Sequence, residues 1–186
     1  MLYTRKGDTG TTKTFGCDQR VSKSSKIAEA LGSLDEVNSF LGLIKVESKT
    51  FKNTVPGTDK GITLTDVVHE IQETLFIIQA EVAGYPKKLE AEKVKKIEKI
   101  IDDIETVLPP IKSFFISGGT KTAALFDVAR TIARRAERRV VDAKEEGAEI
   151  SAYALSFLNR LSSLLYALAR FSNHVADIKE KPPKYR

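Results

Sequence analysis

The segment 128–141 reads VARTIARRAERRVV and holds five arginines. Arginine stays positively charged at every physiological pH, and its planar fork suits pairs of carboxylate or phosphate oxygens. At about 100° per helical residue, Arg130, Arg134 and Arg138 form one ladder, and Glu137 lies beside it. Like charges at this spacing repel one another unless an anion joins them. The pattern therefore indicates either a solvated helix face or a clamp for a polyphosphate or for the acids of another chain.

The N-terminal segment 4–13, TRKGDTGTTK, is a second candidate for binding an anion. Glycines let backbone amides converge, basic side chains add charge and threonines add hydroxyl donors. The residues concerned are Arg5, Lys6, Gly7, Gly10 and Lys13. The segment is not a Walker loop, because the G-x-x-x-x-G-K-[ST] spacing is missing. Taken alone, such a loop is more often a turn than a binding site.

Five further side chains are candidates that also have an ordinary structural explanation. Asp35 and Glu36 could be general acids or bases, although a helical bundle usually pairs such carboxylates with arginine. Asn159 borders the apolar stripe of the last helical segment, where a buried, hydrogen-bonded amide is the simplest expectation. Phe114 and Phe115 are either core side chains or the wall of a pocket for a flat ligand.

Residues for nucleophilic or metal chemistry are sparse. His69, His174 and Cys17 show neither triad nor zinc-site spacing and are interpreted as bystanders. An enzyme with this sequence would therefore work by positioning and charge stabilisation rather than through a protein nucleophile. The single cysteine fits a reducing cytosol.

Length and composition favour one domain that buries its own core. The chain has 186 residues, of which 41% are hydrophobic and 30% are charged, and its net charge is +5. This excess of positive charge is too small for a typical nucleic-acid-binding protein. The sequence also shows neither a secretory h-region nor an apolar run of about 18 residues, so we expect no signal peptide and no membrane span.

The elements that must position these residues are helices. Residues 1–24 lack periodicity and are expected to form a loop or hairpin, and the basic tail 177–186 is expected to be frayed. Apolar residues recur every three or four positions between 25 and 176, which predicts five amphipathic helices in an antiparallel all-α bundle. The fourth helix (about 120–146) carries a predicted core stripe of Leu125, Ala129, Ile132, Ala133, Ala136, Val140 and Ala143.

Four segments together resemble the PduO-type ATP:cob(I)alamin adenosyltransferases. They are YTRKGDTGTT, KIAEALGSLDEVNSFLG, SGG followed by VARTIARRAERRVV, and FLNRLSSLLYALAR, in the family's order from residue 3 to about 171. The resemblance implies a cytoplasmic homotrimer of five-helix bundles with active sites between subunits. It also implies transfer of the 5′-deoxyadenosyl group of ATP to the cobalt of cob(I)alamin, with release of triphosphate.

The implied chemistry explains why a protein nucleophile is not needed, because reduced cobalt is itself a strong nucleophile. The implied metal is Mg²⁺ bound through the ATP phosphates rather than by fixed protein ligands. A reductase that delivers cob(I)alamin and an adenosylcobalamin-dependent enzyme are possible partners. Neither nucleic acid nor a membrane is expected to bind.

Site residues follow by matching the family's motifs to this chain. In the N-terminal loop, those implied to surround the ATP phosphates are Thr4, Arg5, Lys6, Gly7, Thr12, Lys13 and Lys23. In the helices, those implied to bind ATP are Arg134, Arg135, Glu137, Arg138 and Asn159. Arg139 is left as solvated surface.

The resemblance implies a different set of residues on the side of the site that binds the corrinoid. Asp35 and Arg130 match a pair that bridges subunits, and a phenylalanine before the glycine pair is implied to exclude the lower axial ligand of cobalt. That residue is Phe114 or Phe115, and we favour Phe114. Arg134, Arg130, Asp35 and Phe114 are therefore the implied catalytic residues.

Two departures from the family pattern and two alternatives remain. FFISGG is one residue shorter than the common Phe-x-x-Pro-x-Gly-Gly and lacks its proline, and Ser163 replaces the acid of the NRLSD motif.

One alternative function is that of a non-catalytic bundle that senses ATP without corrinoid chemistry. The other is a helical RNA- or DNA-binding protein, which is disfavoured because Glu137 interrupts the arginine ladder and no aromatic residue accompanies it.

Overall fold

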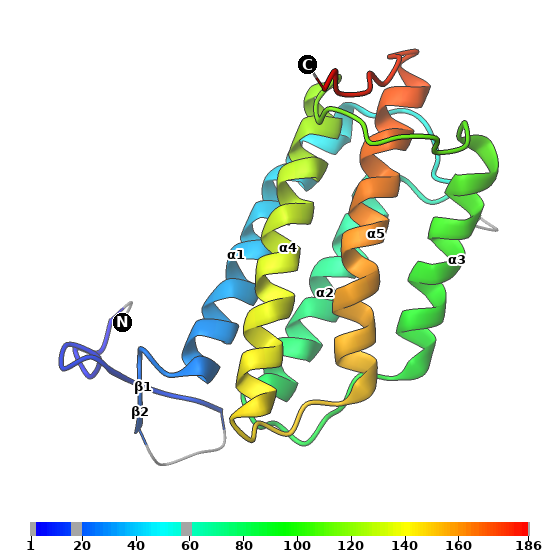
Figure 1. The fold of residues 1–186 in the computed structure, drawn as a ribbon. Coiled ribbons are helices and arrows are strands. Elements are labelled where there is room, and N and C mark those ends of the chain that lie inside the picture. Colours follow the sequence, from blue (N-terminus) through cyan, green and yellow to red (C-terminus); the bar gives the residue numbers. More distant parts are fainter. Residues whose placement is uncertain (1–2, 16–19, 57–60, 186) are drawn as a thin grey trace.

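The fold is a bundle of five helices with a small hairpin at its N-terminal end (Figure 1). The computed structural model describes residues 3–15, 20–56 and 61–185; Cys17 and Gly57, the second residue of a Pro-Gly pair, lie outside them. The helices are α1 (Lys26–Glu47), α2 (Leu64–Val82), α3 (Ala91–Val107), α4 (Lys121–Glu145) and α5 (Ala152–Val175), and a short 3-10 helix η1 (Ser48–Thr50) follows α1. The predicted all-α five-helix bundle is confirmed.

The position of α4 in the bundle places its arginines next to two other helices. α1 packs against α2 and α4, α4 packs against α5, and α5 packs against α3. Consecutive helices alternate in direction, so α3 and α5, although neighbours, run the same way (Figure 1). Within the described residues, none of these helices is both long and apolar enough to cross a membrane.

Helix boundaries follow from local sequence signals. Serine or threonine side chains cap the N-termini of α1, α2, α4 and α5, where each accepts a hydrogen bond from an otherwise unpaired backbone N–H. At α2 the Asp66 carboxylate accepts from Thr63 in return, and this hydrogen bonding lowers the pKa of Asp66 below its usual 3.8. Gly84 and Gly147 follow α2 and α4 with φ of 92° and 102°, as expected for C-terminal caps.

The core face of α4 is wider than the predicted stripe. Phe126 is fully buried although it lies outside the predicted stripe, and Leu125, which the stripe includes, is partly buried and packs against the core. The cause is that α4 packs against both α1 and α5, which buries a broader arc than a single contact would. Ala129, Ala133 and Ala136 are buried and let these neighbours approach closely.

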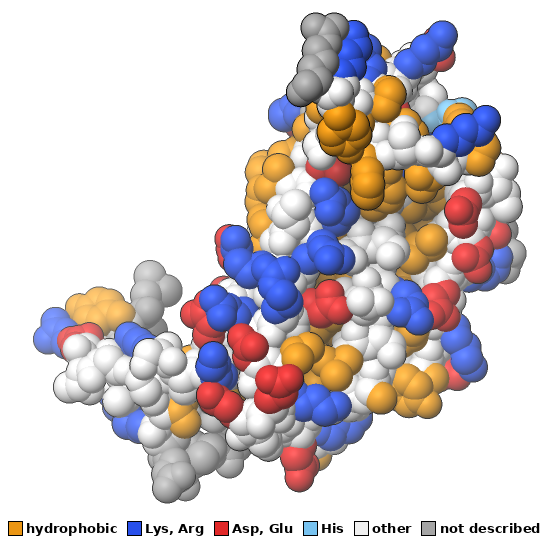
Figure 2. Space-filling view, in the orientation of Figure 1, with side chains coloured by type: hydrophobic (Ala, Val, Ile, Leu, Met, Phe, Trp, Pro, Cys, Tyr) orange, Lys and Arg blue, Asp and Glu red, His pale blue; other side chains and the backbone are white. Residues whose placement is uncertain are grey.

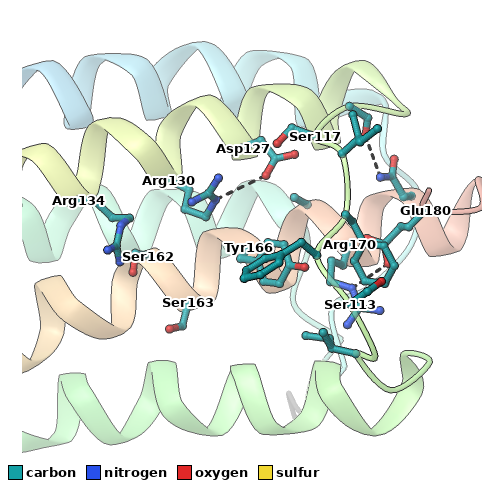
Figure 3. Close-up of a pocket in the computed structure, with 17 residues that line it drawn as sticks. Ser113, Ser117, Asp127, Arg130, Arg134, Ser162, Ser163, Tyr166, Arg170 and Glu180 are labelled. Carbon is teal, nitrogen blue, oxygen red and sulfur yellow. Dashed lines mark hydrogen bonds and ion pairs between the residues drawn. The ribbon is translucent and has the colours of Figure 1, made fainter. Parts of the chain in front are cut away.

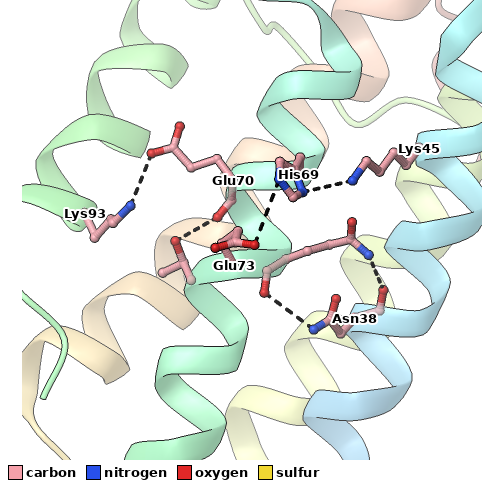
Figure 4. A network of polar contacts seen from close by, with 8 residues as sticks. Asn38, Lys45, His69, Glu70, Glu73 and Lys93 are labelled. Atoms are coloured by element: carbon pink, nitrogen blue, oxygen red, sulfur yellow. Dashed lines mark hydrogen bonds and ion pairs between the residues drawn. The ribbon is translucent and has the colours of Figure 1, made fainter. Parts of the chain in front are cut away.

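Polar contacts tie α2 to α1 on one side and to α3 on the other (Figure 4). Asn38, which falls in the apolar stripe of α1, is only 5% exposed and exchanges hydrogen bonds with Gln72, whose side chain donates to the Asn38 carbonyl at 3.0 Å. Lys45 Nζ lies 2.9 Å from His69 Nδ1, and Glu70 pairs with two lysines of α3. His69 therefore takes part in a surface network between helices.

The N-terminal segment forms an antiparallel hairpin of β1 (Thr11–Lys13) and β2 (Arg20–Ser22), as the loop-or-hairpin prediction allowed. It extends away from the bundle near the start of α1 and the end of α4 (Figure 1). The Phe15 ring packs edge-on against Tyr85, with ring centroids 4.7 Å apart. This contact anchors one end of the hairpin to the loop after α2.

The C-terminal tail is held against the bundle, and the prediction that it is frayed was wrong for its first part. The Ile116 amide donates to the Lys181 carbonyl at 2.9 Å, and Glu180 accepts from Arg170 at 2.9 Å. A tertiary ion pair and a backbone hydrogen bond thus override the polar, proline-containing composition of the tail.

Candidate functional site

A cavity of about 550 Å³ lies between the segment that joins α3 to α4 and the adjoining faces of α4 and α5 (Figure 3). Its lining combines aromatic, charged and hydroxyl side chains. They include Phe114, Phe115, Asp127, Arg130, Arg134, Ser162, Ser163, Tyr166 and Arg170. An apolar wall with a few charged groups is the usual composition of a site for a small molecule.

The two phenylalanines have different surroundings. Phe114 is 80% exposed and lines the cavity, so the core interpretation is wrong for this residue. Phe115 is partly buried beneath Arg170, whose guanidinium carbon lies 5.3 Å from the ring centroid. Phe115 is therefore held in place, while the Phe114 ring is free to contact a ligand.

Backbone conformation and steric limits explain why two glycines follow the two phenylalanines. Gly118 and Gly119 have φ of 125° and 100°, a region that strongly favours glycine. A Cβ on Gly119 would also overlap the side chain of Asn173. That side chain accepts from the Thr120 amide and donates to the Gly118 carbonyl, both at 2.9 Å.

The arginine ladder begins in the cavity. Arg130 Nε lies 3.6 Å from Asp127 Oδ1, and this buried nitrogen makes no hydrogen bond to any described residue. Arg134 lines the same cavity and is exposed, and Arg138 follows one turn later. In the described part of the chain neither Arg134 nor Arg138 forms an ion pair, and basic side chains gather over the middle of α4 in Figure 2.

The remaining two arginines of the segment face α1. Arg135 is 2.5 Å from Glu36, and Arg139 lies 3.4 Å from both Glu29 and Asp142. Arg139, which was interpreted as solvated surface, is partly exposed and in addition links α4 to α1 through Glu29. The structure therefore does not bring Arg135 into line with Arg134 and Arg138.

Asn159 and Glu137 meet across α4 and α5. Asn159 is exposed, so the buried-amide interpretation was wrong, and its Nδ2 donates to Glu137 Oε1 at 2.9 Å. Its Oδ1 accepts from Arg160 at 2.9 Å. This contact fixes the ladder of α4 to the NRL segment of α5.

Asp35 lies on the exposed surface of α1. Among the residues that the structure describes, no side chain pairs with it, and Arg130 is paired with Asp127 instead. The predicted Asp35–Arg130 pair is thus not made within one chain. It would need a second copy.

The hairpin carries a loop that is built around two basic side chains. Arg20 donates to the Thr11 hydroxyl at 2.7 Å, to the Thr11 carbonyl at 2.8 Å and to the Lys6 carbonyl. Lys23 extends over Gly7, where a Cβ would come within 3.1 Å of its Nζ. The loop thus brings Lys6, Gly7 and Lys23 together.

The other predicted loop residues belong to the same hairpin. Thr4 and Arg5 are exposed at its start, and Arg5 has a φ of 59°. Thr12 and Lys13 lie in β1, opposite Val21 and Arg20. The hairpin lies at the end of the bundle where α4 ends. The segment 108–120, which joins α3 to α4 and covers one side of the cavity (the roof segment), lies at the opposite end (Figure 1).

Sequence reasoning did not single out several residues of the site. Arg20 organises the loop, and Asp127, Tyr166, Arg170 and Glu180 line the cavity. Asp127 was recognisable from its i, i+3 spacing to Arg130. Burial raises the pKa of the Tyr166 hydroxyl.

Comparison with known proteins identifies the family. The family model described as "Cobalamin adenosyltransferase" matches residues 2–172. The chain belongs to the cobalamin adenosyltransferase family. It is 40% identical over 176 residues to a corrinoid adenosyltransferase of Bacillus subtilis, covering 92% of this chain and 86% of that protein.

A second relative of this family is longer. The chain is 36% identical over 182 residues to the corrinoid adenosyltransferase PduO of Citrobacter freundii, which covers 94% of this chain but only 50% of that protein. The chain thus spans about half the length of this relative.

Solved structures of the family share the fold. A variant of a PduO-type ATP:corrinoid adenosyltransferase from Lactobacillus reuteri, complexed with cobalamin and ATP, superposes with a TM-score of 0.84 at 31% identity and covers 100% of both chains. Another variant of that enzyme, complexed with ATP, gives a TM-score of 0.82 at 31% identity, covering 98% of this chain and 100% of that one.

Proposed function

We propose that this chain transfers the 5′-deoxyadenosyl group of ATP to the cobalt of cob(I)alamin or a related corrinoid, and releases triphosphate. The observation that carries the proposal is that Arg134 belongs both to the aromatic-walled cavity and to the line of arginines along α4. A flat corrinoid in the cavity and a polyphosphate along α4 would then be adjacent. The relatives and solved structures of the family support this activity.

The reaction does not require a nucleophile from the protein. The electron pair of reduced cobalt attacks C5′ of the ribose, a Co–C bond forms, and the C5′–O bond breaks with its electrons leaving on triphosphate. The protein must hold C5′ in line with cobalt and neutralise the departing charge. Arg134 and Arg138 are suited to this because their forks are exposed and form no ion pairs with other described residues.

The phosphate site is proposed to be completed by a second copy of the chain. Its loop residues are Thr4, Arg5, Lys6, Gly7, Thr12, Lys13 and Lys23. The proposal is supported by the position of the hairpin, which extends away from its own bundle (Figure 1). A homotrimer with sites between subunits would let the loop of one subunit reach the ladder of its neighbour.

The corrinoid side is proposed to depend on the same assembly. Asp35 of one copy would pair with Arg130 of another, whose side chain lines the cavity and is 28% exposed. Phe114 would cover the lower face of cobalt and exclude its axial ligand. Phe115 is the weaker candidate because Arg170 already covers its ring.

The remaining ATP contacts are assigned to Arg135, Glu137 and Asn159. Glu137 and Asn159 already meet at 2.9 Å, whereas Arg135 would first have to leave Glu36. Ser163 lines the cavity with a hydroxyl where the family pattern often has an acid, so any contact made by that carboxylate is absent here.

Mg²⁺ would enter with ATP. The described residues contain no group of three His, Cys, Asp or Glu side chains placed to hold a metal, so the ion would be bound by phosphate oxygens. We also propose that residues 1–186 act as one domain in the cytoplasm. A reductase would supply cob(I)alamin, and an adenosylcobalamin-dependent enzyme would accept the product.

The decisive experiment is an anaerobic assay of ATP with chemically reduced cobalamin, in which the corrinoid spectrum and triphosphate are measured together. We expect equal amounts of adenosylcobalamin and triphosphate. ATP binding without either product would refute the transferase activity and support the ATP-sensing alternative. Sedimentation of the purified protein tests the trimer.

A further inference from the structure

Arg170 at the C-terminal end of α5 connects three separate parts of the chain. It is only 4% exposed. Its Nε donates to Glu180 of the tail and its NH2 group donates to the Pro109 carbonyl, both at 2.9 Å, while the guanidinium covers the Phe115 ring. A single side chain thus binds the tail and two points of the segment that joins α3 to α4, and Figure 3 shows Arg170 beside Glu180.

The same segment is fastened at two further places. Asn173, one turn after Arg170 on α5, binds the Gly118 carbonyl and the Thr120 amide. The tail adds the hydrogen bond from the Ile116 amide to the Lys181 carbonyl at 2.9 Å. Contacts therefore hold the segment at 109, 115, 116, 118 and 120.

Phe114 directly precedes the held part of this segment. Its side chain is 80% exposed in the cavity, although the next two residues, Phe115 and Ile116, are held. The contact of the Phe115 ring with Arg170 and the hydrogen bond of the Ile116 amide limit where the neighbouring Phe114 ring can lie, and neither contact occupies the cavity beside that ring. The segment thus presents one aromatic ring to the ligand at a small entropic cost.

The charges of Arg170 and Glu180 make the tail and the segment interdependent. A buried guanidinium without a carboxylate partner is costly, so Arg170 keeps its position over Phe115 only while Glu180 neutralises it. Arg170 also contacts its two acceptors through separate nitrogens of one rigid, planar group, a fixed geometry that the single ammonium nitrogen of a lysine does not provide.

We propose that Arg170 and Glu180 are positioning residues that use the C-terminal tail to fix the roof segment and place Phe114 in the corrinoid cavity. Neither residue needs to touch cobalt or ATP. The inference rests on the proposed function for its consequence in catalysis, but the fastening of the segment can be measured without any corrinoid.

The first test measures the segment directly. Glu180→Gln removes the charge of the tail partner, and Asp177→Asn makes the same chemical change at an exposed tail residue whose side chain forms no hydrogen bond or ion pair with the described residues. Hydrogen exchange of the peptide covering 111–119 should be about tenfold faster in Glu180→Gln, as expected for loss of a charge-assisted hydrogen bond, and unchanged in Asp177→Asn. Equal protection in Glu180→Gln and wild type would overturn the proposal.

The second test measures the consequence for the reaction. Glu180→Gln should raise the KM for cob(I)alamin about tenfold and leave the Kd for ATP unchanged. Arg170→Lys, which keeps the charge but loses the fork, should shift exchange and KM in the same direction. Because Arg170→Lys leaves the sequence of the tail unchanged, agreement between the two variants would show that the effect of Glu180→Gln does not come from unfolding of the tail.

The outcomes separate the two proposals. If the wild type makes no adenosylcobalamin, the proposed function fails, whereas the exchange result still decides whether Arg170 and Glu180 fasten the segment. If the segment loosens in Glu180→Gln but the corrinoid KM stays at the wild-type value, the positioning role is refuted and the proposed function is not.

Discussion

Arg134 is the residue whose loss should affect the reaction most directly without affecting the fold. It is exposed and forms no ion pair with any described residue, so Arg134→Ala should change the free energy of unfolding by no more than about 0.5 kcal/mol. Its fork can donate charge-assisted hydrogen bonds to the departing triphosphate, and each such bond contributes about 1.5–3 kcal/mol. Water at this exposed position weakens them. We therefore expect a loss of about 2.7 kcal/mol of transition-state stabilisation, which is about 100-fold in kcat/KM.

The assay follows adenosylcobalamin formation under anaerobic conditions across a range of ATP concentrations. Arg134→Lys should lose about tenfold, because the charge remains while the two-pronged geometry is lost. Arg139→Ala is the matched control on the same helix: it removes ion pairs to Glu29 and Asp142 at the surface and should keep the wild-type rate. An Arg134→Ala rate within threefold of wild type would refute the assignment of this residue to the triphosphate.

Three further predictions concern assembly, the corrinoid and the roof segment. Asp35→Asn should raise the KM for cob(I)alamin more than the Kd for ATP and weaken the trimer in sedimentation; equal loss of both ligands would contradict its role as a subunit bridge. Phe114→Ala should lower kcat at least tenfold with an unchanged melting temperature, since the ring is exposed, and a lower melting temperature would show that it packs in the core. Gly119→Ala should lower the free energy of unfolding by about 2–3 kcal/mol, because its Cβ overlaps Asn173, whereas Gly118→Ala, with open space around it, should cost about 1 kcal/mol in backbone strain alone. Calorimetry showing equal melting temperatures for the two alanine variants would refute this steric argument.

Some features of the fold were predictable because their causes are local. Apolar periodicity, serine and threonine caps and the glycines after α2 and α4 act over a few residues, and the helix positions followed from them. Phe126 was missing from the predicted core stripe because apolar spacing does not reveal that α4 packs against both α1 and α5.

The polar interpretations were less reliable, because they depend on partners far away in the chain. Asn159 looked like a buried amide next to an apolar stripe, yet it lies on the surface and binds Glu137 of α4. Arg139 looked solvated, yet it pairs with Glu29 of α1. The identity of such partners is set by which helices are neighbours, which periodicity does not specify.

A helical bundle with a line of arginines on one helix and a glycine-threonine loop before the first helix could be predicted from the spacing and chemistry of residues close in sequence. Three features depend instead on how distant segments pack: which aromatic ring is free, which arginines lack ion pairs in the described part of the chain, and the attachment of the tail to the segment that joins α3 to α4. The physical reason is that Arg170 and Glu180 meet through packing of distant segments, where burial turns two ordinary surface charges into an interdependent pair.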